Sequence, residues 1–215
     1  MLKKVITDDG SATFHNSGYD EHYHTKSGAD EESIKKFAVP CRIKELAKTG
    51  KIAILDVCFG LGYNTAAAID AAKDSNPDCQ ITIVALENDQ EILDKIQEIN
   101  STFKSYATIK ESMKTKKEKD GVKIMLLLDD ARKTIKNVKE KFDAVFLDPF
   151  SPKTCPELWT EEFFIDIRKT MKPEAILATY SCARVVRENL KKAGFTVEDG
   201  PIVGRRSPST IAKIE

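Results

Sequence analysis

The fold of this chain is decided by residues 51–65, which read KIAILDVCFGLGYNT. Their first half, KIAILDV, is a short apolar run that ends at a glycine-rich turn, as a buried strand does. The alanine-rich stretch Thr65–Lys73 follows the turn and predicts a helix. Gly60 and Gly62 let the backbone turn tightly and approach a ligand closely, and the start of the helix offers free N–H groups. The stretch therefore predicts a strand, a ligand-binding turn and a helix.

Strand-like and helix-like segments alternate through the rest of the chain. Six further strands are predicted at residues 81–86, 123–128, 142–147, 175–179, 195–198 and 210–214. Helices are predicted at residues 89–100, from 129 to about 140, at 161–171 and at 183–193. This alternation is typical of a parallel sheet that helices cover on both faces. The predicted fold class is therefore α/β, with a doubly wound, mostly parallel sheet of seven strands.

Two segments lie outside this alternation. Residues 1–50 form an N-terminal extension with an aromatic and polar stretch and then a predicted helix from about Asp30 to Lys48. We expect this extension to pack over the cofactor and substrate site of the domain formed by residues 51–215. Residues 110–123, KESMKTKKEKDGVK, carry six lysines against three acids. Such a run is usually a solvated loop or helix.

Composition limits the classes of function. The 215 residues are 41% hydrophobic and 32% charged, which is typical of a soluble globular protein. No apolar run approaches the roughly 20 residues needed to span a bilayer, so no membrane partner is expected. Five scattered cysteines without a C-x-x-C pair, and three histidines without ligand spacing, argue for a cytoplasmic protein with reduced thiols and no metal site. The formal charge is zero, so a nucleic acid would be held by a local basic patch.

Acidic residues follow three successive strands, at the edge where open α/β sheets bind ligands. Asp56 is placed to meet a cationic amine, Glu87 to accept both hydroxyls of a ribose, and Asp130 to accept from the amino group of an adenine. Each acid alone also suits a helix N-cap or first turn. Together they outline the amino acid, ribose and adenine of S-adenosylmethionine. Thr65 occupies the third glycine position of G-x-G-x-x-G, which argues against NAD.

The fourth strand ends at Asp148-Pro149-Phe150-Ser151-Pro152, which is similar to the D/N-P-P-Y/F loops of enzymes that methylate nitrogen. Methyl transfer from a sulfonium requires mainly that an amine lone pair be aligned with the methyl carbon. A carboxylate beside the amine can orient it and receive its proton. Asp148 is therefore the predicted catalytic acid–base residue.

The chain resembles the methyltransferase half of the bifunctional enzymes that make 5-methylaminomethyl-2-thiouridine in tRNA, the MnmC-like family. Residues 58–64 are similar to its G-F-G-x-G-x-N motif, residues 146–152 to F-L-D-G-F-x-P and residues 156–160 to N-P-x-M-W-[ST]. Shorter matches are found at residues 14–23, 27–33, 177–181 and 204–206. The resemblance implies a Rossmann-like class I methyltransferase fold, S-adenosylmethionine as cofactor, and methylation of the aminomethyl nitrogen at the wobble uridine of tRNA.

The predicted site combines the strand-end residues with those of the matching motifs. The cofactor set is Asp56, Phe59, Gly60, Gly62, Asn64, Glu87, Asp130, Ala131 and Asp148, with Tyr23 added as a stacking residue. The substrate set is Pro149 and Phe150, with Arg184, Arg187, Arg205 and Arg206 as the predicted phosphate contacts. A solvated helix face is the alternative for these arginines.

Some features depart from the family pattern. Cys58 and Pro149 replace glycines, and Asp56 replaces a glutamate. The sequence contains no FAD-dependent oxidase domain, so a separate enzyme is expected to supply the aminomethyl precursor, unless the substrate is a different amine. Two other interpretations stay open: an aminopropyltransferase such as spermidine synthase, which uses decarboxylated S-adenosylmethionine, and a non-catalytic nucleotide-binding module.

Overall fold

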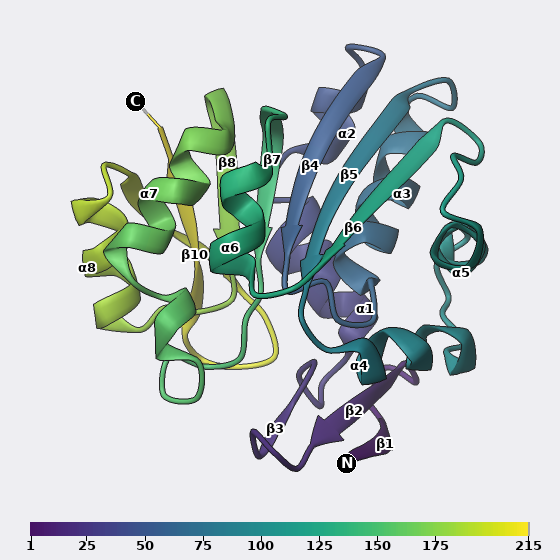
Figure 1. Ribbon diagram of the computed structural model, residues 1–215, viewed down its shortest axis with the longest axis horizontal. Helices are drawn as coiled ribbons and strands as arrows, with labels where there is room; N and C mark the ends of the chain where they lie inside the picture. The colour runs from purple at the N-terminus through teal and green to yellow at the C-terminus, as the bar shows by residue number, and fades with distance from the viewer. Residues whose placement is uncertain (215) are drawn as a thin grey trace.

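The central sheet has seven strands in the order β6-β5-β4-β7-β8-β10-β9 (Figure 1). They are β4 (Lys51–Val57), β5 (Gln80–Glu87), β6 (Val122–Leu128), β7 (Phe142–Leu147), β8 (Met171–Thr179), β9 (Thr196–Ile202) and β10 (Pro208–Lys213). The strands from β6 to β8 pair in parallel, and β10 runs antiparallel to β8 and β9. The computed structural model describes residues 1–214, so Glu215 of the predicted domain lies outside it. The predicted α/β fold class with a mostly parallel seven-stranded sheet is confirmed.

The order of strands reverses at β4. The chain adds β5 and β6 on one side of β4, and then β7 and β8 on the other. All of β4 except its first and third residues is buried, because neighbouring strands and helices enclose it. A reversal of this kind opens a crevice at the carboxyl ends of the strands, where ligands bind in open α/β sheets. The fold thus positions a site beyond the ends of β4 and β7.

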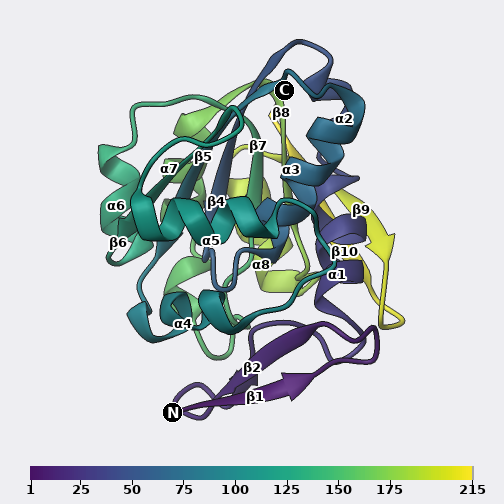
Figure 2. The ribbon, with the colours of Figure 1, turned by 90° about the vertical axis from the view of Figure 1, so that its right-hand side faces the viewer.

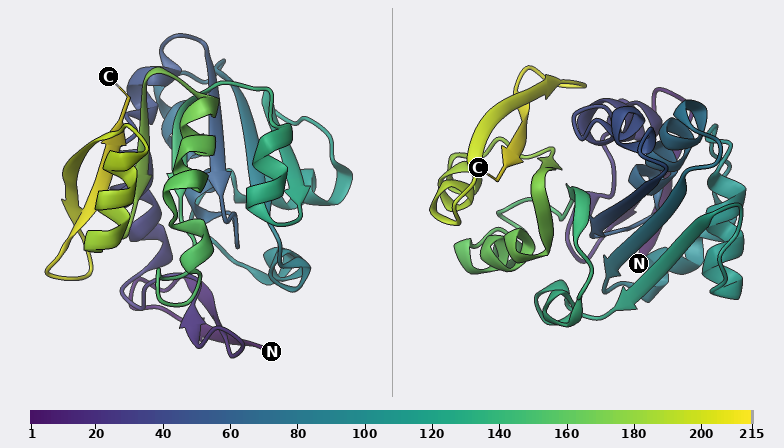
Figure 3. Two further views of the ribbon diagram at one scale, coloured as in Figure 1. Left: turned by 60° about the vertical axis from the view of Figure 1, so that its left-hand side comes forward. Right: turned by 90° about the horizontal axis from the view of Figure 1, so that it is seen from above.

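Helices cover both faces of the sheet (Figure 3). They are α3 (Tyr63–Ser75), α4 (Gln90–Lys95), α5 (Tyr106–Thr115), α6 (Ala131–Thr134), α7 (Glu161–Thr170) and α8 (Arg184–Lys192), with short 3-10 turns at Ile96–Glu98, Ile135–Asn137 and Pro156–Leu158. Buried side chains of α6, α7 and α8 share one apolar cluster, and those of α3, α4 and α5 share another. Every strand of this sheet except β9 contributes to both clusters, so the core lies in two layers.

The N-terminal residues form a small sheet of their own. It contains β1 (Leu2–Ile6), β2 (Ala12–Asn16) and β3 (Glu21–His22), all antiparallel. This sheet lies beyond the carboxyl ends of β4 and β5 (Figures 1 and 2). The buried hydroxyl of Tyr63, in α3, donates to the carbonyl of Ala12 at 2.9 Å. The small sheet is therefore tied to the first helix after the glycine turn.

The helix expected from Asp30 to Lys48 is divided into three pieces. These are α1 (Ala29–Glu32), a π-helix (Ser33–Ala38) and α2 (Ile43–Ala47). Pro40 lies in the break, where its ring and missing N–H are incompatible with a continuing helix. Arg42 then adopts a left-handed conformation, with φ of 56°. The expectation of one continuous helix was wrong for this reason.

The lysine-rich segment is partly helical and exposed. Its residues 110–115 belong to α5, which ends at Thr115, and the following Lys116 has a left-handed φ of 56°. Most of its lysines are exposed, in agreement with a solvated run. Over residues 1–214, the structure contains no helix long and apolar enough to cross a membrane.

Candidate active site

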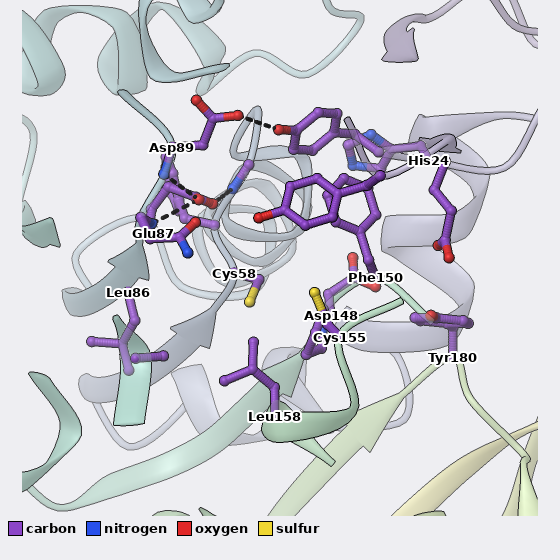
Figure 4. A pocket seen from close by; sticks show the side chains of 18 of the residues that line it. His24, Cys58, Leu86, Glu87, Asp89, Asp148, Phe150, Cys155, Leu158 and Tyr180 are labelled. Atoms are coloured by element: carbon purple, nitrogen blue, oxygen red, sulfur yellow. Dashed lines mark hydrogen bonds between the residues drawn. The ribbon is translucent and has the colours of Figure 1, made fainter. Parts of the chain in front are cut away.

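A cavity of about 370 Å³ opens at the carboxyl ends of β4, β5, β6 and β7. Its walls come from the segments that follow these four strands and from residues of the N-terminal sheet. The lining includes residues 58–60, 86–89, 130–132, 148–150 and 21–26. Figure 4 shows Leu86 and Glu87 on one side of the view, with Tyr180 and His24 on the other. This volume lies within the roughly 300–1,000 Å³ usual for small-molecule sites.

The glycine turn brings the backbone to the cavity wall. Gly60 and Gly62 have positive φ angles of 54° and 77°. A Cβ atom on Gly62 would lie 2.7 Å from the Phe59 ring, so only glycine fits there. Gly60 and Phe59 line the cavity, whereas Gly62 lies behind it. Cys58 also lines the cavity and has a left-handed φ of 65°, at the position where the family has a glycine.

Glu87 is almost completely buried at the end of β5. Its Oε2 accepts the Gly60 N–H at 2.8 Å, and its Oε1 accepts the N–H groups of Asn88 and Asp89 at 2.8 and 2.9 Å. Burial raises the pKa of Glu87, and these backbone hydrogen bonds oppose the rise. A carboxylate has about four acceptor positions, so Oε2 keeps a lone pair for a ligand hydroxyl. Glu87 thus fixes the turn and lines the cavity at once.

Asp130 lines the cavity at the start of α6, together with Ala131. Its Oδ1 accepts the backbone N–H of Arg132 at 2.9 Å, and its two oxygens accept the Nε of the same arginine at 3.0 and 3.1 Å. The hydrogen bond from Arg132 lowers the pKa of Asp130, so the carboxyl is an acceptor at neutral pH. Asp129 does not line the cavity.

Asp56 and Asn64 lie behind the cavity wall. Asp56 is fully buried, and its Oδ2 accepts the Thr65 hydroxyl at 2.7 Å. Burial, and next the charge of Glu87, raises the pKa of Asp56 to about 7. The Asn64 side chain donates from Nδ2 to Oδ2 of Asp148 at 2.8 Å. Neither residue lines the cavity, although both were predicted to contact the cofactor.

Asp148 lies on the cavity wall at the end of β7. Its backbone N–H donates to the carbonyl of Val57 at 3.1 Å, which holds the residue beside the glycine turn. Burial raises the pKa of Asp148 well above its ordinary value, the charge of Glu32 adds to the rise, and Asn64 opposes it. A buried carboxyl of this kind favours a cation beside it, because the cation stabilises the ionised form.

Aromatic side chains surround the entry to the cavity. The Phe150 ring lies 4.9 Å from both the Tyr19 and Tyr23 rings, measured between centroids. The Tyr23 hydroxyl donates to Oδ2 of Asp89 at 2.7 Å. Glu21 accepts hydrogen bonds from the backbone and hydroxyl of Ser151 and from the hydroxyl of Thr154. The N-terminal segment is therefore bound to loops after two different strands.

Several cavity residues were not predicted from the sequence, among them Glu21, Glu32 and Asp89. Glu21 lies in a segment without strand or helix periodicity, Glu32 lies in the predicted N-terminal helix, for which the sequence indicates no ligand, and Asp89 caps a helix. Glu21 and Ser151 are 130 positions apart in the chain. The sequence signal for their proximity is only the acidic and aromatic character of residues 19–23.

None of the four predicted phosphate-contact arginines lines the cavity. Arg187 is paired with Asp199 at 2.6 Å and hydrogen-bonds to Thr210, and Arg184 is paired with Glu188 at 2.7 Å. Arg205 donates to the carbonyl of Tyr180 and lies 5.9 Å from its ring centroid. Because Tyr180 lines the cavity, Arg205 stands at its rim. Arg206 is exposed.

Histidines and cysteines show no ligand geometry for a metal. His24 is buried against Tyr63, with ring centroids 4.9 Å apart, and burial lowers its pKa to about 4. Within residues 1–214 there is no group of three or more His, Cys, Asp or Glu side chains that could hold a metal ion.

Several known proteins are similar to this chain in sequence. The family described as S-adenosyl-L-methionine-dependent methyltransferase matches residues 94–215, more than half of the chain. The uncharacterized protein MJ0670 of Methanocaldococcus jannaschii is 33% identical over 97% of this chain, which spans 58% of that protein. The tRNA 5-methylaminomethyl-2-thiouridine biosynthesis bifunctional protein MnmC of Campylobacter hominis is 30% identical over 77% of this chain, which spans 26% of that protein.

Solved structures are similar to this chain in fold. The crystal structure of MNMC2 from Aquifex aeolicus has a TM-score of 0.90 and 35% identity, and the match covers all of this chain and 71% of that one. Spermidine synthase from Thermotoga maritima, at 12% identity, has a TM-score of 0.61 over 99% of this chain and 70% of its own, a likeness of fold alone. The predicted cofactor and resemblance are confirmed at the level of the family. The chain belongs to the S-adenosyl-L-methionine-dependent methyltransferases, in the MnmC-like family.

Proposed function

We propose that this protein methylates the nitrogen of an aminomethyl group on the wobble uridine of a tRNA. The observation that carries the proposal is the position of Asp148: half-buried, on the cavity wall, and hydrogen-bonded by Asn64 from behind. An alkylamine is largely protonated near neutral pH, and a buried carboxylate attracts that cation and can take one proton from it. The names of the MnmC relatives supply the tRNA nucleoside.

The cofactor fits the cavity residues. The glycine turn leaves room at the wall, Glu87 keeps a lone pair for a ribose hydroxyl, and Asp130 is an ionised acceptor. S-adenosyl-L-methionine supplies an activated methyl group, whose S–C bond breaks as the N–C bond forms and leaves S-adenosyl-L-homocysteine. Asp56, behind the wall, supports the start of α3 through Thr65.

Asp148 would act on the substrate nitrogen. Its carboxylate accepts one proton from the ammonium, which frees the lone pair to attack the methyl carbon. Asn64 fixes the orientation of the carboxylate through its 2.8 Å hydrogen bond. Pro149 and Phe150 follow directly on the same wall, and Phe150 offers a flat apolar surface beside the amine for a uridine base.

The N-terminal segment would form the cover of the site, as proposed for residues 1–50. Tyr23 and Glu21 attach it to the loops after β5 and β7, so it shields the reacting atoms from water. The proposed phosphate contacts are Arg205 at the rim and Arg184 and Arg206 on the surface. Arg187 is engaged with Asp199 and is less available. The aminomethyl group must come from a separate reaction, because methyl transfer does not build that C–N bond. A tRNA substrate agrees with the predicted cytoplasmic location.

Calorimetry on the purified protein tests the first half of the proposal. S-adenosyl-L-methionine is expected to bind, and Glu87→Ala is expected to weaken its binding about 100-fold or more, because the turn and a ribose contact are lost together. Preferential binding of decarboxylated S-adenosylmethionine would instead indicate an aminopropyltransferase. Methyl transfer to undermodified tRNA, absent in Asp148→Asn, tests the second half. Methyl transfer that persists in Asp148→Asn would exclude the proposed role of the carboxylate.

A further inference from the structure

A buried ion pair lies at the N-terminal side of the cavity. Oε1 of Glu32 is 2.6 Å from Nζ of Lys36, and the two side chains are 5% and 1% exposed. Oε2 of Glu32 accepts the Thr25 N–H at 3.0 Å. A buried ion pair contributes little stability compared with apolar residues of similar size, because removing both charges from water is costly. Stability alone therefore does not account for this pair.

The pair is directed toward the catalytic acid. Glu32 lines the same cavity as Asp148. After burial, the charge of Glu32 is the largest influence that raises the pKa of Asp148, and Lys36 lowers it. The pKa of Tyr180, also on the wall, is raised by burial and then by the charges of Asp148, Glu21 and Glu32. Glu32 thus lines the same cavity as Asp148 and Tyr180, and Figure 4 shows Tyr180 and Glu87 on opposite sides of the view.

The local backbone is specialised as well. Lys36 belongs to the π-helix that begins directly after Glu32. Helices of this type are rare and occur often at functional sites. The neighbouring pair Glu31–Lys35 has the same spacing and the same 2.6 Å distance, but its side chains are 38% and 56% exposed and Glu31 does not line the cavity. The two pairs thus differ in burial and in access to the site.

The chemistry of the proposed reaction leaves a place for a second carboxylate. A primary ammonium group that has given one proton to Asp148 becomes an amine with two N–H bonds and a lone pair that points at the methyl group. Inside a closed site each of these needs an acceptor. The hydrogen bonds to Lys36 and Thr25 use one lone pair on each Glu32 oxygen, so each oxygen retains another.

We infer that Glu32 accepts an N–H of the acceptor amine and that this contact limits transfer to one methyl group. The inference rests on the proposed function. Lys36 balances the charge of Glu32 through the 2.6 Å ion pair. After the first transfer, the nitrogen carries a methyl group and two N–H bonds. A second transfer requires this nitrogen to lose one of its two protons. The one N–H that remains can then donate to only one of Asp148 and Glu32.

The second transfer is therefore unfavourable. The first methyl group would have to face a buried carboxylate, with loss of one charge-assisted hydrogen bond. Such a bond contributes about 1.5–3 kcal/mol, or a factor of about 10 to 100 in rate or affinity. Glu32 would act as a specificity-determining residue that selects primary amines.

The test compares two double variants. Glu32→Leu with Lys36→Met removes the buried pair and leaves no unpaired charge, and Glu31→Leu with Lys35→Met removes the exposed pair. Each is assayed with S-adenosyl-L-methionine and tRNA bearing an aminomethyluridine, and the nucleosides are analysed by mass spectrometry. In the buried-pair variant the KM for this tRNA should rise about 10- to 100-fold and a dimethylamino nucleoside should appear. The affinity for S-adenosyl-L-methionine should stay unchanged in both variants, and the exposed-pair variant should give one methyl only.

A second measurement needs no variant. The wild-type protein is offered tRNA that already carries the methylaminomethyl group, and its kcat/KM should be at least about 10- to 100-fold lower than for the primary amine. Equal use of both amines, or a buried-pair variant with wild-type KM and product, would overturn the inference alone. Absence of transfer to the primary amine by the wild-type protein would overturn the proposed function, and this inference with it.

Discussion

The side-chain amide of Asn64 donates a 2.8 Å hydrogen bond to the carboxyl of Asp148. Asn64 belongs to the first turn of α3, whereas Asp148 follows β7, 84 positions later in the chain. The bond therefore joins the start of α3 to the acid that we propose to face the substrate. Because Asn64 does not line the cavity, we propose a positioning role for it in place of the cofactor contact that the sequence motif implied.

Asn64→Leu is expected to lower kcat/KM for methyl transfer about 10- to 100-fold, because a hydrogen bond to a charged group contributes about 1.5–3 kcal/mol. Binding of S-adenosyl-L-methionine should change little, since Asn64 does not line the cavity. Steady-state kinetics and calorimetry measure the two quantities. Asn76→Leu is a matched control, because its amide donates to the carbonyl of Ala47 at 3.0 Å, far from the site. Equal kinetic losses in both variants would assign Asn64 a merely structural role.

The kcat/KM for methyl transfer should rise with pH. Burial and then the charge of Glu32 raise the pKa of Asp148, while Lys36 lowers it. Only the ionised carboxylate accepts the proton of the amine, so kcat/KM should fall about tenfold per pH unit below that pKa. Lys36→Met removes a nearby positive charge, which should move this acid limb to higher pH.

The pH–rate profile of Lys35→Met provides the control, because Lys35 is exposed and does not line the cavity. The amine titrates alike in all three proteins, so a difference between the profiles reports a group of the protein. Identical acid limbs for Lys36→Met and the wild type would show that Lys36 has no influence on the catalytic carboxylate.

Substitutions of two adjacent acids should differ in their effect on the affinity for the cofactor. Asp130 lines the cavity and Asp129 does not. Asp130→Ala removes the proposed adenine contact and the N-cap of α6, so the Kd for S-adenosyl-L-methionine should rise about tenfold or more. Asp129→Ala should leave it near the wild-type value. Calorimetry that gives the two variants equal affinities would refute the assignment of Asp130.

If the N-terminal segment covers the site as proposed, it should slow cofactor release. Tyr23→Phe removes only the hydroxyl that donates to Asp89 at 2.7 Å, and the ring stays beside Phe150. The dissociation rate of S-adenosyl-L-methionine should rise about 10-fold, because the variant loses this hydrogen bond to a carboxylate and the longer one that the hydroxyl accepts from Asn16 at 3.3 Å. Stopped-flow fluorescence measures this rate. Tyr19→Phe, whose ring also contacts Phe150, is the control and should behave like the wild type.

Much of the fold follows from local sequence. The apolar runs at β4, β5 and β7 and the glycine turn set the sheet, because a short buried run between turn residues is compatible with little else. The same logic predicts where strands end, and Glu87, Asp130 and Asp148 do line the cavity. A residue just beyond a parallel strand lies at the binding edge of the sheet, because the position of the strand alone determines this.

Side-chain direction and long-range contacts were harder to predict. Asp56 is the last residue but one of β4, and its side chain points to Thr65 behind the cavity wall, because successive side chains of a strand alternate between the two faces of the sheet. Glu21 and Glu32 reach the cavity only because the N-terminal segment folds back over it, across a sequence distance that local patterns do not encode. The interruption of the helix around Pro40, by contrast, has a local cause, because proline cannot continue a helix.

The most direct test is methyl transfer to a defined tRNA. The wild-type protein is incubated with S-adenosyl-L-methionine and tRNA that carries an aminomethyl group at the wobble uridine, and the nucleosides are then analysed by mass spectrometry. We predict one added methyl group on the amine nitrogen, and none with Asp148→Asn, although that variant still binds the cofactor. Unmodified nucleosides after incubation with a cofactor-bound wild-type protein would contradict the account.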